Sequence, residues 1–158
     1  MARTIWAAPQ PGERRISPSA VGHGMLPLMR TDAQQAGDAA EALVAGRLEA
    51  AGWRILGRQV RVGRAELDIV AVDQATPARL VIVEVRSRTR RDFGLPEETV
   101  RASKRLRLRR AAQSLRERGI LTDGTVVPPL PLRLDLVVVE PPTSPGGPPR
   151  VRHHVAAI

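Results

Sequence analysis

The sequence lacks cysteine and is poor in aromatic residues. Without cysteine the chain forms no disulfide, zinc–thiolate site or cysteine nucleophile, and we expect it in a reducing cytoplasm. Trp6, Trp53 and Phe93 are the only aromatic residues, so the core must be built from valine, leucine, isoleucine and alanine. No apolar run reaches the length of a bilayer span, so we expect no membrane association.

Positive charge is abundant and clustered. The formal net charge is +9, and residues 86–118 hold twelve basic residues against four acidic ones. All but one of the 25 basic residues are arginine, which a GC-rich genome would explain, but base composition does not explain the clustering. A concentrated basic surface favours binding to a polyanion such as nucleic acid. A merely solvated arginine-rich helix is the alternative.

The hydrophobic pattern predicts one α/β domain. Residues 1–31 are rich in proline and glycine and are predicted to form a disordered tail, whereas residues 32–158 form the domain. Thr31 or Asp32 can begin a helix that ends near Ala51. The further predicted elements are strands at 53–62, 65–72 and 80–87, a helix at 97–118, a strand at 132–140, a Pro/Gly linker at 141–149 and an edge strand at 151–156. This order, α-β-β-β-α-β-(β), predicts a mixed central sheet flanked by helices.

Three carboxylates stand out against their apolar surroundings. Glu41 falls on the apolar stripe of the first helix, and not on the side of Asp38. Asp68 and Glu84 lie in apolar strands, where a carboxylate is costly unless a positive group meets it. Side-chain alternation places Asp68 on the same face as Glu66 and Val70, and hairpin register would make Asp68 and Glu84 neighbours. The pair therefore indicates a site for Mg²⁺ or Mn²⁺.

Roles can be assigned to the groups around this pair. Asp68 and Glu84 would hold the metal ion, Glu41 a metal-bound water, and Arg86 the negative charge that develops on a phosphate. The expected contacts to backbone phosphates are Arg88, Arg101, Lys104, Arg105, Arg109 and Arg110. The alternative is that the acids only form ion pairs with arginines.

Two other pairs are interpreted as structural. Arg133 and Asp135 form a structural ion pair in this interpretation. His153 and His154 are adjacent in a predicted strand and point to opposite faces, so they cannot bind one metal together.

The ordered motifs resemble a known superfamily. The pattern Glu…Asp…Glu-x-Lys on this order of elements resembles the PD-(D/E)xK, or restriction-endonuclease-like, superfamily. More narrowly, the chain resembles the YraN-type family of uncharacterised endonuclease-like proteins, related in fold to archaeal Holliday-junction resolvases. The matching stretches, within about residues 35–158, are 37–41, 48–56, 66–71, 83–88, 93–94, 104–105 and 134–137. The resemblance implies metal-dependent hydrolysis of structured or branched DNA, with Glu41, Asp68 and Glu84 at the metal site.

The sequence departs from the family pattern at two positions. Ala65 stands where the family usually has glycine, and Arg86 where it usually has lysine. Arginine is always protonated, so it cannot transfer a proton as an amine can. The alternatives are therefore a catalytically weak or inactive nucleic-acid-binding module and an RNA-associated basic protein. Lys104, the only lysine, could supply an amine from the next helix. We expect DNA as the partner and leave a homodimer open.

Overall fold

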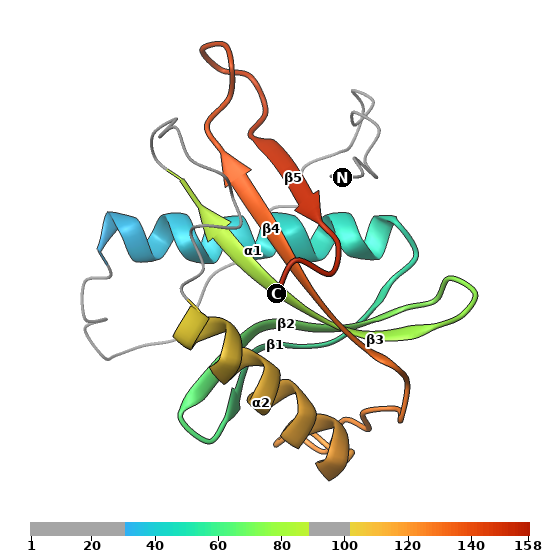
Figure 1. Ribbon diagram of the computed structural model, residues 1–158. Coiled ribbons are helices and arrows are strands. Elements are labelled where there is room, and N and C mark those ends of the chain that lie inside the picture. The colour runs from blue at the N-terminus through green and yellow to red at the C-terminus, as the bar shows by residue number, and fades with distance from the viewer. Residues whose placement is uncertain (1–30, 89–101) are drawn as a thin grey trace, which may run out of the picture.

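A computed structural model describes residues 31–88 and 102–158 (Figure 1). The predicted tail, the helix start before residue 102 and the Phe93–Gly94 motif fall outside the described residues, apart from Thr31.

Helix α1 spans Asp32–Ala50 and begins with a capping box, in which Thr31 and Gln34 each accept a hydrogen bond from the other's backbone N–H. The chain leaves the helix at Gly52, whose φ of 84° suits a residue without a side chain.

The described strands form one mixed sheet. Its strands are β1 (Arg54–Val62), β2 (Ala65–Asp73), β3 (Arg79–Ser87), β4 (Leu132–Glu140) and β5 (Arg150–His154). They lie side by side in chain order, and β3–β4 is the parallel pair among antiparallel neighbours. Parallel strands need a crossover, and helix α2 (Ala102–Arg118) lies in it. The predicted α/β class and mixed sheet are confirmed.

The two helices cover opposite faces of the sheet (Figure 1). Val81 and Val83 of β3 pack in the cluster that contains α1, whereas Leu80 and Ile82 pack in the cluster that contains α2. Because both faces of β3 are buried, its sequence is apolar from Leu80 to Val83, directly before Glu84. The α2 face of this strand therefore carries Glu84 and then Arg86 into the site described below.

Alternation fails at one place in the sheet. Leu67 packs in the same cluster as Val70, although strict alternation would put these two side chains on opposite faces, so alternation fails between them. Glu66 and Asp68, which were predicted to share a face, line the same cavity. The partner strand β1 has a register shift just before Gly57 and a left-handed residue, Gln59, with φ of 49°. Such irregularities increase local twist, which accounts for the change of face.

The last strand is fixed by a buried polar network. Asp135 accepts hydrogen bonds from Arg133 Nε at 3.0 Å and from the Ala156 backbone N–H at 2.9 Å, and lies 2.8 Å from His153 Nε2. The Arg133 guanidinium also lies 5.2 Å from the centre of the Trp53 ring. The structural interpretation of Arg133, Asp135 and His153 agrees with these contacts.

The Pro/Gly segment 141–149 joins β4 to β5, which pair as antiparallel neighbours, so it is a hairpin connection within the sheet. Over residues 31–88 and 102–158, no helix combines the length and apolarity needed to cross a membrane.

Candidate carboxylate site where β2 and β3 diverge

Two acids meet where two neighbouring strands separate. The β2–β3 ladder ends at the pair Ile69–Val83, and the next two positions are Asp68 and Glu84. The backbone N–H of Val85 then donates a hydrogen bond to Asp68 Oδ2 at 2.7 Å. The side chain of Asp68 therefore reaches across the point where the strands part, next to Glu84, as the register argument predicts.

Glu84 is buried and only half satisfied. Its side chain is 1% exposed, and its Oε1 receives the Lys104 ammonium group and, at 3.2 Å, the Arg86 guanidinium. Its Oε2 is buried and has no hydrogen-bond partner among the described residues. Because buried polar atoms are nearly always paired, this oxygen is positioned to receive a further ligand.

The protonation of Asp68 is affected by its burial next to Glu84. Burial, followed by the negative charge of Glu84, raises the pKa of Asp68 to about 7. The Val85 hydrogen bond and the charge of Lys104 oppose this rise but do not cancel it. An additional cation beside the pair would favour the ionised form of Asp68.

Glu41 approaches from the other layer. Burial raises the pKa of Glu41, and a hydrogen bond at 3.2 Å from Gln59 Nε2 opposes the rise. The same amide group donates to Asp38 at 3.3 Å, so Asp38 and Glu41 share one side of α1 and the prediction that separated them is wrong. Residues three apart on a helix are neighbours, which explains the shared partner. Gln59, which the β1–β2 register places opposite Asp68, was not singled out by any sequence signal.

The ligand set suits an ion that needs few protein groups. Among residues 31–88 and 102–158, no three acidic or histidine side chains converge to hold a metal. Mg²⁺ takes one or two carboxylates and keeps several waters. The two acids, with one unpaired buried oxygen, fit that requirement.

Lys104 belongs to this site. It extends from the first turn of α2 to Glu84, so the structure brings the chain's only lysine to the acid pair. A cavity of about 190 Å³ leads to it, lined by Arg64, Ala65, Glu66, Asp68, Lys104, Arg107 and Leu108. Glu66, at the cavity wall, lies 3.4 Å from Arg61 in an exposed ion pair.

The other predicted phosphate contacts are distributed around the site. On α2, Arg105 is half-buried and Arg109 and Arg110 are exposed. Arg88 follows β3 and is half-buried, with its backbone N–H bonded to the Val139 carbonyl. Arg101 lies outside the described residues. Arg64, Arg107 and Arg118, not predicted as contacts, line cavities on the same side of the sheet. Helical spacing could have revealed the last two.

The fold and site define an α/β protein whose mixed sheet presents two adjacent carboxylates to a lysine and an arginine. The model of the uncharacterised protein family UPF0102 matches residues 40–139, and the chain belongs to this family, the YraN-type family that its motifs resemble. It is 40% identical over 108 residues to UPF0102 protein STH1475 of Symbiobacterium thermophilum, covering 68% of this chain and 84% of the relative. It is 41% identical over 128 residues to the UPF0102 protein of Anaeromyxobacter dehalogenans, covering 80% and 87%.

Among solved structures, one similar chain is Pyrococcus furiosus SfsA in complex with Ca²⁺, with a TM-score of 0.35 and 15% identity. The match covers 78% of this chain and 62% of SfsA, and the similarity is too low to support an inference about fold or function.

Proposed function

We propose that this protein is a Mg²⁺- or Mn²⁺-dependent endonuclease with a restriction-endonuclease-like core that acts on structured or branched DNA. The proposal rests chiefly on the buried acid pair, in which Glu84 Oε2 has no partner among the described residues. The order of elements from α1 to β4 agrees with the order expected for that core. The family itself is uncharacterised, so the site must carry the argument.

The chain's own residues divide the work. Asp68 and Glu84 would hold the ion, which polarises a phosphate and lowers the pKa of a bound water when present. Arg86 and Lys104, both on Glu84 Oε1, place positive charge where a phosphodiester gains negative charge during attack. Glu41, oriented by Gln59, would accept a hydrogen bond from the attacking water.

Lys104 compensates for the arginine at position 86. Arg86 stays protonated, so it can bind a phosphate but cannot exchange a proton. An amine can serve both purposes, and Lys104 contacts the same carboxylate oxygen that Arg86 approaches. We assign the proton-transfer role of the missing strand lysine to Lys104.

A cleavage screen tests the proposal. Labelled four-way DNA, single-stranded DNA and linear duplex would be incubated with increasing Mg²⁺ or Mn²⁺, with wild type, Asp68→Ala and Glu84→Ala. Metal-dependent cleavage that is strongest on branched DNA is expected, and each variant should lose it while still binding DNA. A calorimetric Mn²⁺ titration gives a second readout, with a binding event that Asp68→Ala abolishes. Absence of cleavage and of Mn²⁺ binding in the wild type would overturn the assignment.

A non-catalytic nucleic-acid-binding module is the second candidate. The presence of both Arg86 and Lys104 on Glu84 favours it, because two cations already neutralise one buried carboxylate. DNA binding that is unchanged in Asp68→Ala and Glu84→Ala, without turnover, would support the module. Direct competition between DNA and RNA of equal length would then identify the preferred nucleic acid, since salt dependence alone does not.

A further inference from the structure

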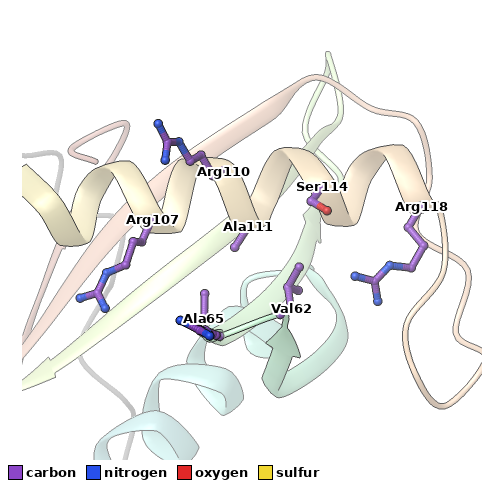
Figure 2. Close-up of a pocket in the computed structure, with 9 residues that line it drawn as sticks. Val62, Ala65, Arg107, Arg110, Ala111, Ser114 and Arg118 are labelled. Atoms are coloured by element: carbon purple, nitrogen blue, oxygen red, sulfur yellow. The ribbon is translucent and has the colours of Figure 1, made fainter.

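A second cavity lies beside the carboxylate site, between α2 and the turn that joins β1 to β2 (Figure 2). Its volume is about 420 Å³. We call it the arginine groove, and its lining consists of Val62, Gly63, Arg64, Ala65, Arg107, Arg110, Ala111, Ser114 and Arg118. Four of these nine residues are arginine and none is acidic, so the groove carries concentrated positive charge.

The side chains of α2 are arranged along the groove. Figure 2 shows Arg107 and Arg118 extending below the helix toward the hairpin, whereas Arg110 points to the other side of α2. Arg107 and Arg118 share one helix face, and Ala111 and Ser114 fall between them. The two arginines are eleven positions apart on the helix, which separates them by about 16 Å along the axis.

This positive charge has no carboxylate partner in the part of the chain that the structure describes. Within the described residues, none of the four groove arginines lies within ion-pair distance of a carboxylate. The hairpin turn adds Arg64 opposite α2, so like charges face each other across the hollow. Such an arrangement favours binding of a polyanion that neutralises several guanidinium groups at once.

The arginine groove is continuous with the carboxylate site. Arg64, Ala65 and Arg107 line both the groove and the smaller cavity that contains Asp68 and Lys104. We propose that the groove binds the backbone phosphates of one nucleic-acid strand and directs that strand to the acid pair. This inference rests on the proposed function, and it assigns the substrate path to Arg64, Arg107 and Arg118.

The lining also indicates how the strand is recognised. Sequence-tolerant binding of exposed bases normally uses aromatic platforms, and the groove has none. Guanidinium groups instead bind phosphate oxygens through two parallel hydrogen bonds. Binding should therefore be independent of base sequence and weaken steeply as salt rises. For each tenfold rise in salt, the logarithm of the binding constant should fall by about 0.7 per contact to a single-strand phosphate and about 0.9 per contact to a duplex phosphate.

The test compares two variants that lose the same charge. Arg107→Gln/Arg118→Gln removes two groove arginines, and Arg54→Gln/Arg116→Gln removes two arginines that line neither cavity. Binding to fluorescent branched and single-stranded DNA would be measured by anisotropy at several salt concentrations with a chelator present. The groove variant should lose at least about tenfold in affinity and flatten the salt dependence by about 1.4 to 1.8 units. The control should change far less.

A third variant tests the charge of the groove while keeping every arginine stem. Ser114→Glu places a negative charge in the groove, and it should weaken binding in the same way. Equal losses for the two double variants, or displacement of DNA by polyglutamate of equal charge, would overturn the inference.

The inference and the proposed function can fail separately. Weakened binding in the groove variant, with no cleavage by the wild type, would support the groove and refute the nuclease. Asp68-dependent cleavage with unchanged DNA binding in the groove variant would support the nuclease and refute the groove.

Discussion

The acid pair should make the metal-free protein less stable as pH rises. Burial and the charge of Glu84 raise the pKa of Asp68 from 3.8 to about 7. Between these values the folded protein keeps a proton that the unfolded chain has released, so the free energy of unfolding falls with pH. The stability is fully present below about pH 4 and is lost as pH rises through about 7. A rise of about three pKa units corresponds to at most about 4 kcal/mol.

Asp68→Asn isolates this effect. The amide cannot ionise, but its oxygen can still accept the hydrogen bond that Val85 donates to Asp68. With a chelator present, the variant should be more stable than wild type above about pH 7, by up to about 4 kcal/mol. The difference should shrink toward about pH 4. Urea unfolding at a series of pH values measures it directly.

Adding metal should narrow this difference in stability between wild type and Asp68→Asn. At a pH above 7, a hundredfold excess of Mn²⁺ over its dissociation constant should stabilise wild type by about 2.7 kcal/mol and leave Asp68→Asn unchanged. Metal-free stability curves that run parallel for the two proteins across this pH range would refute the raised pKa of Asp68. Equal stabilisation of both proteins by Mn²⁺ would refute the role of Asp68 as a metal ligand.

Two further predictions concern the buried network and the site lysine. Asp135→Ala should lower the free energy of unfolding by about 3–5 kcal/mol, because it removes the buried carboxylate shared by Arg133, His153 and the Ala156 N–H and leaves Arg133 with Asp73 alone. A loss below about 1 kcal/mol in urea unfolding would contradict this. Although burial opposes them, hydrogen bonds from His153 and Arg133 hold the pKa of Asp135 below its usual value. Its contribution is therefore present above about pH 4 and lost in acid, so wild type should lose stability more steeply than Asp135→Ala during acid titration. Lys104→Ala should slow cleavage by about 10²- to 10⁴-fold, and Arg86→Lys added to it should restore activity; a Lys104→Ala enzyme that cleaves at the wild-type rate would exclude the lysine role.

Local pattern was enough to place the central acids. The strand ends, the turn and the two-residue side-chain period all lie close in sequence, so they determined the positions of Asp68 and Glu84 relative to each other. The same period does not predict the side of the sheet on which Leu67 packs, because the neighbouring strand contains a register shift and a left-handed residue that alternation cannot anticipate.

Contacts between the helices and the sheet were harder to predict from the sequence. Gln59 lies 18 residues from Glu41 in sequence, and its hydrogen bond depends on how α1 packs on β1. Lys104 could only be proposed as an amine from the next helix, and its contact with Glu84 depends on the path of the crossover. The arginine groove was missed for the same reason, since one wall comes from a hairpin and the other from α2.

The turn between β1 and β2 leaves no room for length variation. It has two residues, Gly63 and Arg64, and Gly63 adopts a φ of 60° that suits glycine. One inserted residue would slip the hairpin register, rotate Gln59 away from its place opposite Asp68 and withdraw Arg64 from both cavities. A single short loop therefore fixes the position of the arginine groove relative to the carboxylate site, and we expect family members to tolerate substitutions in the flanking strands far better than insertions at this loop.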